Sequence, residues 1–176
     1  MSALPLHYAR VLVVDDDDEV RHIISSMLTE AGFTVSTAPT ALSALDLLGK
    51  GEFDVMVTDV ALPDALDGVE LVKYARARHP TLRSLFISGR RGPIVDEPER
   101  DDFVGKPFRS GELLGCVLEL LCRGLPKKEV LSSSRELELA TIEAKLARFQ
   151  DECRKGEADA GDYTATPTGR EPRGRP

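Results

Sequence analysis

Carboxylates, a hydroxyl and a lysine each follow a separate apolar run in the first two thirds of the 176-residue sequence. Four aspartates, Asp15 to Asp18, follow the first run and Asp59 follows the third, while Ser88 follows the fourth and Lys106 the fifth. A carboxylate can act as a nucleophile, several together can bind a divalent cation, and hydroxyl and ammonium groups can hold phosphoryl oxygens. If the fold brings these groups together, they predict phosphoryl-transfer chemistry.

The spacing of apolar residues predicts the elements that must position these groups. Between residues 10 and 123, short apolar runs alternate with longer stretches of helical periodicity, which is typical of βα repetition and a parallel sheet. The predicted strands are 11–14, 33–37, 53–58, 85–87 and 103–104, and helical stripes occur in 18–31, 42–49, 69–80 and 113–121. The sequence therefore predicts an α/β domain of five strands and four clear helices.

Functional groups of parallel α/β sheets gather at the carboxyl ends of the strands. If the first and third strands are neighbours, carboxylates from both converge there, and like charges at close range raise one another's pKa. A hard divalent cation neutralises such a cluster, and Mg²⁺ suits a site with few protein ligands and several waters. The sequence contains no GxxxxGK[ST] loop, GxGxxG turn or GxSxG elbow, so other common phosphate-binding and nucleophilic motifs are excluded.

The stretch between the fourth and fifth predicted strands is unusual. Residues 89–102 contain two prolines, two glycines and eight charged residues, with almost no apolar periodicity. Proline removes a backbone donor and disfavours helix at the preceding residue. We therefore expect no full helix there, and at most one turn around Pro98–Arg100.

The composition changes after residue 123. We predict a flexible N-terminus over 1–8, a globular domain over 9–123, a linker over 124–132, an amphipathic helix over 133–155 and a disordered tail over 156–176. The helix carries apolar residues at heptad spacing, and two interpretations stay open. It packs back onto the domain, or it forms a short coiled coil, as a homodimer or with a partner helix.

Charge and hydropathy exclude several classes of protein. Residues 1–123 hold 13 basic and 20 acidic side chains, a net charge of −7, and the remainder is neutral with 10 of each. An acidic domain repels phosphate backbones, so we expect no nucleic-acid binding. No apolar run approaches the roughly 20 residues of a membrane span, and no secretion signal opens the sequence, so a cytoplasmic location is expected. The three cysteines lack CxxC spacing and are interpreted as simple thiols.

Four motifs in order, VLVVDDDDEVR, VTDVALPDALDGVEL, LFISG and FVGKPF, resemble the receiver domain of bacterial two-component response regulators. The resemblance spans about residues 10–123. It implies a flavodoxin-like, doubly wound five-stranded parallel sheet of order 2-1-3-4-5. This chain departs from the family in having its fourth helix shortened or absent and in carrying a C-terminal helical extension.

The resemblance also implies roles for individual residues. Asp59 is the implied phosphoacceptor, assisted by Ser88 as the switch hydroxyl and Lys106 as the lysine that pairs with the phosphoryl group. The implied Mg²⁺ ligands are Asp15, Asp16, Asp59 and the backbone carbonyl of Ala61. Phe103 matches the aromatic residue that follows the switch. Asp17 and Asp18 fall outside this set and are interpreted as acids at a helix N-terminus.

The function implied is that of a phosphoacceptor rather than an enzyme, since it would catalyse only its own phosphorylation and dephosphorylation. A histidine kinase or phosphotransferase would supply the phosphoryl group. An unknown downstream protein would be contacted through the 89–102 loop, or through the helix around 113–121 and its C-terminal extension, with no DNA-binding output domain. Two alternatives are a phosphorylation-independent scaffold acting through 133–155, and a Mg²⁺-dependent hydrolase of the haloacid-dehalogenase type using Asp15-x-Asp17.

Overall fold

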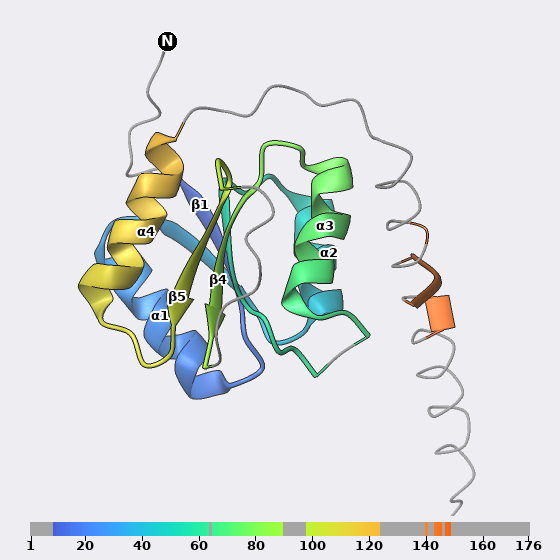
Figure 1. Cartoon of the computed structure of the whole chain (residues 1–176), viewed down its shortest axis with the longest axis horizontal. Helices are drawn as coiled ribbons and strands as arrows, with labels where there is room; N and C mark the ends of the chain where they lie inside the picture. Colours follow the sequence, from blue (N-terminus) through green and yellow to red (C-terminus); the bar gives the residue numbers. More distant parts are fainter. Residues whose placement is uncertain are drawn as a thin grey trace, which may run out of the picture.

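The structure is a computed structural model that describes residues 9–63, 65–89 and 98–123, together with residues 140, 143–145, 147 and 148. Five parallel strands form one sheet in the order β2-β1-β3-β4-β5 (Figure 1). The predicted α/β fold and its strand order are thereby confirmed.

The strands are β1 (Arg10–Val14), β2 (Thr34–Ala38), β3 (Val55–Asp59), β4 (Arg83–Ser88) and β5 (Asp101–Gly105). The helices are α1 (Asp18–Glu30), α2 (Ala41–Lys50), α3 (Gly68–Arg78) and α4 (Ser110–Cys122), of which α4 is the helix predicted around residues 113–121.

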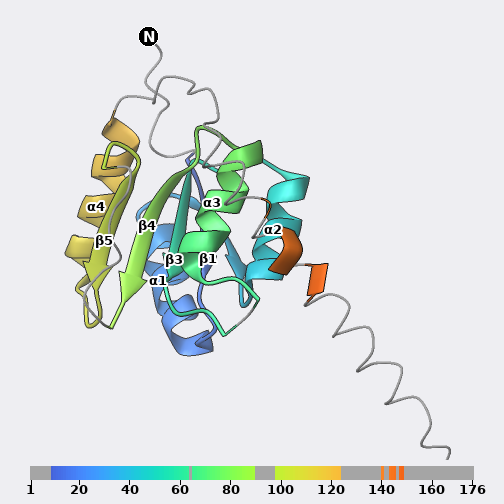
Figure 2. The ribbon, with the colours of Figure 1, turned by 45° about the vertical axis from the view of Figure 1, so that its right-hand side comes forward.

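The helices form two layers around the sheet. Helices α1 and α4 cover one face, and α2 and α3 cover the other (Figures 1 and 2). Along β1, Val11 and Val13 pack into the core beneath α1 and α4, whereas Leu12 and Val14 pack into the core beneath α2 and α3. Because both faces are covered, β1 is apolar and buried from Val11 to Val14, after the exposed Arg10 at its start, as is typical of parallel sheets.

Strands β4 and β5 are longer than the sequence predicted, because they begin with polar residues that are buried. The strands predicted at 85–87 and 103–104 extend back to Arg83 and Asp101. Asp101 is buried against Arg76 of α3, and the Ser84 hydroxyl donates to its Oδ1 over 2.5 Å. Buried charges are tolerated when paired and hydrogen-bonded, a condition that apolar periodicity does not reveal.

Between β4 and β5 the described residues are Gly89 and residues 98–100, and these form no helix. Residues 98–100 form a turn, as predicted, and Arg100 donates to the Pro80 carbonyl over 2.8 Å. The prediction of a shortened or absent helix falls mainly on residues 90–97, which lie outside the described residues.

Most of the predicted appendages lie outside the described residues: 1–8, 124–132, 156–176 and most of 133–155. Six residues of the last segment are described, namely residues 140, 143–145, 147 and 148, and all are in α-helical conformation. Within the described part of the chain, no helix has the length and apolar character that crossing a membrane requires.

Candidate functional site

The sheet brings three carboxylates together at its carboxyl edge. Strands β1 and β3 are neighbours with Val14 opposite Thr58, so Asp15 and Asp59 follow side by side. One carboxylate oxygen from each of Asp15, Asp16 and Asp59 lies within 4.8 Å of the others. Asp15 is buried, Asp59 is partly buried and Asp16 is exposed. The acidic cluster predicted from the strand ends is therefore present.

Lys106 bridges two of these carboxylates from the end of β5. Its Nζ donates to Asp59 Oδ2 over 2.6 Å and to Asp15 Oδ2 over 3.0 Å. Its backbone N–H donates to the Ser88 carbonyl over 2.7 Å, which fixes the turn after β5 against the end of β4. The peptide bond between Lys106 and Pro107 is cis.

Asp59 is also held on its backbone side and at its second oxygen. The Ala61 N–H donates to Asp59 Oδ1 over 3.0 Å, and the Thr58 hydroxyl donates to the Asp59 carbonyl over 2.9 Å. Gly68, the first residue of α3, lies so close that a Cβ there would stand 2.0 Å from the Asp59 carbonyl oxygen. Only glycine allows this approach, which joins α3 directly to the end of β3.

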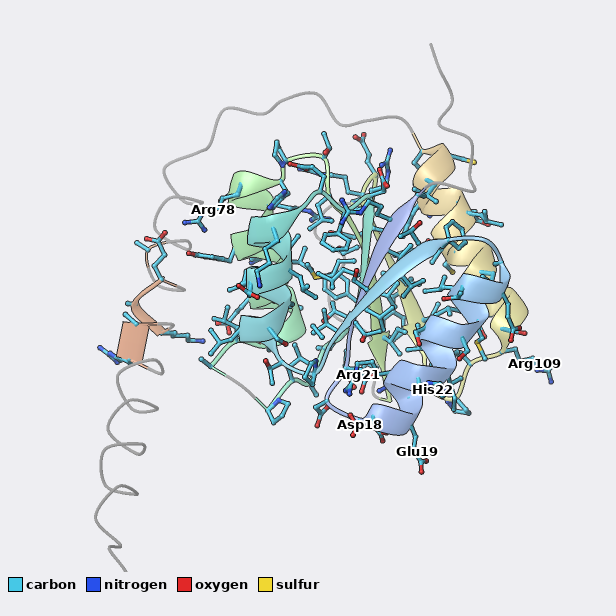
Figure 3. The ribbon with its side chains drawn as sticks, turned by 180° about the vertical axis from the view of Figure 1, so that it is seen from behind. Asp18, Glu19, Arg21, His22, Arg78 and Arg109 are labelled. Carbon is cyan, nitrogen blue, oxygen red and sulfur yellow. The ribbon has the colours of Figure 1, made fainter. Side chains whose placement is uncertain are left out.

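The residues after Asp15 hold it in place and begin α1. The Asp17 N–H donates to Asp15 Oδ1 over 2.9 Å, and Arg21 donates to the Asp15 carbonyl over 2.7 Å. Asp17 caps α1 through the N–H groups of Glu19 and Val20. Asp18 pairs with Arg21 beside the N-terminal end of α1 (Figure 3).

The geometry around α1 bears on two of the interpretations. Asp17 is the N-cap and Asp18 is the first residue of the helix, so both are helix N-terminal acids as predicted. A hydrolase of the haloacid-dehalogenase type would need Asp17 beside Asp15 in the acidic cluster. Its carboxylate is instead directed at the helix N-terminus, which counts against that alternative.

Among the described residues, the carboxylates of the acidic cluster outnumber the cations that pair with them. Burial raises the pKa of Asp15, and hydrogen bonds from Lys106 and the Asp17 N–H offset this only in part. Burial by itself lowers the pKa of Lys106, but its hydrogen bonds to Asp59 and Asp15 outweigh burial and raise it. Asp15 and Asp59 thus share one ammonium group, and Asp16 adds a third carboxylate beside them, which leaves an excess of negative charge.

This donor set fits a hard divalent cation. The ligand atoms are carboxylate oxygens on two strand ends, and the exposed position of Asp16 leaves room for the waters that Mg²⁺ retains. Bound there, Mg²⁺ would supply the positive charge that Lys106 alone does not.

The other predicted site residues lie on the neighbouring strands. Ser88 is the buried last residue of β4 and pairs with Gly105 of β5. Phe103 of β5 is partly buried and packs against the core beneath α2 and α3. Arg21, Thr58 and Gly68 were not among the predicted site residues. Gly68 directly follows the residue that caps α3, but nothing in the local sequence marks its contact with Asp59.

The chain belongs to the response regulator receiver domain family, which it matches over residues 11–117. Receiver domains are signalling phosphoacceptors that interact with histidine kinases or phosphotransferases. The fold and the acidic edge described above are those expected of this family.

Relatives differ in how much of their length the chain spans. It is 29% identical over 116 residues to the response regulator receiver protein CpdR of Brucella abortus, covering 64% of this chain and 96% of CpdR. It is 32% identical over 120 residues to the transcriptional regulatory protein CusR of Escherichia coli, covering 65% of this chain but 52% of CusR. The chemotaxis response regulator CheY4 of Vibrio cholerae is similar in structure, with a TM-score of 0.57, 29% identity and coverage of 64% and 98%.

Proposed function

We propose that Asp59 accepts a phosphoryl group from a histidine kinase or phosphotransferase, and that its phosphorylation state controls a protein contact. The observation that carries this proposal is the pair of hydrogen bonds from Lys106 Nζ to Asp59 Oδ2 and Asp15 Oδ2. A nucleophilic carboxylate is thereby held next to a cation at the edge of the sheet.

The groups next to the Asp59 carboxylate support this proposed transfer. The Ala61 N–H holds Oδ1, which leaves Oδ2, paired with Lys106, as the oxygen beside the cation. When an oxygen of Asp59 bonds to phosphorus, the bond between phosphorus and the phosphodonor breaks and the donor group leaves, and the Lys106 ammonium can follow the charge onto the transferred phosphoryl oxygens. Ser88, at the end of the adjacent strand, is the proposed hydroxyl that turns toward the phosphoryl group, and Phe103 is the proposed aromatic that follows it.

Asp15 and Asp16 are the proposed acid pair that holds Mg²⁺, together with Asp59 and the Ala61 carbonyl. When bound, Mg²⁺ neutralises phosphoryl oxygens during transfer. Asp15 is fixed by the Asp17 N–H and by Arg21, so it presents its carboxylate in a preorganised position. Any catalysis would be limited to the protein's own phosphorylation and dephosphorylation.

The proposed readout is contact with a downstream protein and not DNA binding. Support comes from the acidity of residues 1–123, which disfavours nucleic acid. Similarity to CpdR over nearly all of that protein also supports a regulator built around a receiver domain. The segments proposed beside it are a linker over 124–132, an amphipathic helix over 133–155 and a tail over 156–176, with a cytoplasmic location.

Phosphorylation can be measured directly by intact mass. The full chain is incubated with a small phosphodonor and Mg²⁺, and the wild type is expected to gain one phosphoryl group while Asp59→Asn gains none. Asp46→Asn is the matched control, because Asp46 lies on the exposed side of α2 in an ion pair with Lys50. It should be labelled as the wild type is.

Two results would contradict the proposal. An unlabelled wild type under saturating donor would remove the phosphoacceptor function, and equal labelling of Asp59→Asn would move the acceptor to another residue. Omitting Mg²⁺ is expected to reduce labelling strongly, and undiminished labelling without divalent cation would remove the proposed metal site.

A further inference from the structure

The outward face of α3 carries an ordered row of side chains. Glu70, Tyr74 and Arg78 are spaced four residues apart, so they line one side of the helix. The Arg78 guanidinium lies over the Tyr74 ring, 4.9 Å from its centroid, which holds the arginine against the helix surface. The row is negative at the N-terminal end of α3 and positive at its C-terminal end.

Residues far along the chain present complementary charges to this row. Lys145 forms an ion pair with Glu70, and Glu143 lies close enough to Arg78 to interact with it electrostatically. The described residues of this segment lie on the α2 and α3 side of the sheet in two views (Figures 1 and 2), and Arg78 projects toward that side (Figure 3). We refer to the described residues 140, 143–145, 147 and 148 together as the C-terminal segment.

The row begins at the part of α3 that is joined to Asp59. Gly68 abuts the Asp59 carbonyl and its N–H donates to the Val60 carbonyl over 3.0 Å. The residues on either side of Gly68 close a capping box in which the Asp67 and Glu70 carboxylates each accept from the other residue's N–H. The carboxylate that holds Lys145 is therefore the same carboxylate that caps the helix behind Asp59.

We propose that the outward face of α3 is the docking surface for this chain's own C-terminal segment, and that phosphorylation of Asp59 releases it. The docking is supported by the contacts of Lys145 with Glu70 and of Glu143 with Arg78. Its coupling to the phosphorylation of Asp59 rests on the proposed function. We assign the segment of the same chain as the occupant because its charges complement those of α3. Lys145 meets Glu70 near the start of the helix, and Glu143 lies near Arg78 at its end.

The contact is weak enough to be switched. The Lys145 and Glu70 side chains are 48% and 24% exposed, and exposed ion pairs contribute at most about fivefold to an equilibrium. Because the segment belongs to the same chain, its effective concentration at α3 can reach the mM range, so a weak contact is still populated. Salt shortens the range of such charge pairs, to roughly 3 Å at 1 M, and should release the segment.

Linkage makes the coupling between docking and phosphorylation reciprocal. The proposed direction rests on Glu70, which both holds Lys145 and closes the capping box beside Gly68, so that a shift of this end of α3 on phosphorylation would disturb the ion pair. If docking is stronger in the unphosphorylated protein, docking favours that state. Phosphorylation must then weaken docking by the same factor by which docking disfavours phosphorylation. Phosphorylation should loosen docking, and loss of docking should tighten the binding of a phosphoryl mimic by the same factor, at most about fivefold.

Docking is tested in the full chain with a spin label on Ala147→Cys, the native cysteines being replaced by serine. Paramagnetic broadening of the Tyr74 and Arg78 amides is expected at low salt and should decline at 1 M salt. Lys145→Glu should abolish it, and adding Glu70→Lys to that variant should restore it in part. Arg148→Glu is the matched control, an equal charge reversal on the same exposed segment.

Two results would overturn the docking proposal. One is broadening that Lys145→Glu leaves unchanged or that Arg148→Glu abolishes equally. The other is broadening that appears only when spin-labelled chains are mixed with isotope-labelled chains, since the occupant would then be a second copy.

Coupling is tested on the same protein with beryllium fluoride and Mg²⁺ as the phosphoryl mimic. Broadening of α3 should decrease in the otherwise native chain and stay constant in Asp59→Asn, and Lys145→Glu should bind the mimic up to about fivefold more tightly. A chain that takes up a phosphoryl group by mass but keeps its broadening would overturn the coupling alone. A chain that takes up none would overturn the proposed function and with it the coupling, while the charge-reversal experiment still decides docking.

Discussion

The two edges of the sheet both bury carboxylates, but they neutralise them differently. At the amino edge, Asp101 pairs with Arg76 and Asp102 pairs with Arg123, so each carboxylate has its own guanidinium. At the carboxyl edge, within the residues the structure describes, Asp15 and Asp59 share the ammonium group of Lys106, and Asp16 adds a third carboxylate within 4.8 Å of them.

The hydrogen bonds at the two edges differ in the same way as the ion pairs. Arg76 donates to both Asp101 oxygens, to the Ser84 hydroxyl and to the Leu82 carbonyl, so the amino-edge pair is fully engaged. Asp16 at the other edge is exposed. A saturated cluster can only support the fold, whereas a cluster with excess charge can bind a cation and react. The two edges therefore differ in the ratio of carboxylates to cations, which is one to one at the amino edge and exceeds one at the carboxyl edge.

The largest expected effect is at the amino edge. Asp101→Ala leaves the Arg76 guanidinium buried without its carboxylate, and breaking a buried pair in this way costs about 3–5 kcal/mol of unfolding free energy. Urea denaturation measures the loss. Changing both partners, Arg76→Met with Asp101→Val, should recover at least half of it, because no unpaired charge remains.

The control for this substitution is Asp46→Ala on the exposed face of α2, whose ion pair with Lys50 should contribute less than about 1 kcal/mol. An Asp101→Ala protein no less stable than Asp46→Ala would show that the amino-edge pair is not structural and would remove the contrast between the edges.

The second-largest expected effect is the stabilisation of the protein by Mg²⁺, which should depend on the carboxyl edge and not on the amino edge. At 100 times its dissociation constant, Mg²⁺ should stabilise the wild type by about 2.7 kcal/mol relative to chelator, and Asp16→Asn should lose most of this increment. The measurement is the difference between denaturation midpoints with and without Mg²⁺. Asp18→Asn, which alters an acid outside the cluster, and Asp102→Asn at the amino edge should keep the full increment. A loss in all three variants would indicate nonspecific screening and not a site.

A smaller effect is expected where α3 meets the carboxyl edge. Gly68→Ala places a Cβ against the Asp59 carbonyl and should cost about 2 kcal/mol, as overpacking does elsewhere. Gly49→Ala in α2 is the matched control, because nothing lies within 4 Å of its added Cβ, and it should gain about 0.5–1 kcal/mol. Equal stability of the two variants would show that Gly68 does not fix α3 to β3.

The same contrast explains what could be predicted from the sequence. Asp15, Asp59 and Lys106 follow apolar runs, and the rule that parallel strands gather their functional groups at the carboxyl edge was enough to place them together. Arg83 and Asp101 look like loop residues, because what buries them is a tertiary partner. Asp101 depends on Arg76, which lies 25 residues away, and no local pattern records that contact.

Close approaches were equally hidden. Gly68 stands in a stretch where glycine has several ordinary explanations, and its contact with Asp59 depends on how α3 meets the sheet. The Lys145 contact with Glu70 joins residues 75 positions apart, and the heptad spacing of 133–155 left open whether that segment packs on the domain or on another chain.

The smallest expected effect is a gain in stability at the functional edge. Burial raises the pKa of Asp15 in the folded protein, so its charged form opposes folding. The stability linked to this group is fully present below its unfolded pKa of about 3.9 and is lost as pH rises through the folded pKa.

Asp15→Asn, which remains neutral, should therefore be more stable than the wild type at pH 7 without Mg²⁺, by on the order of 1 kcal/mol. The gain should shrink as pH falls through the raised folded pKa of Asp15 and should be absent below about 3.9, where the wild-type carboxyl is neutral in both states, and Mg²⁺ should reverse it by stabilising the wild type alone. Denaturation at several pH values with chelator measures this. A loss of stability in Asp15→Asn at pH 7 would mean that Lys106 already neutralises the cluster, and that the two edges do not differ in kind.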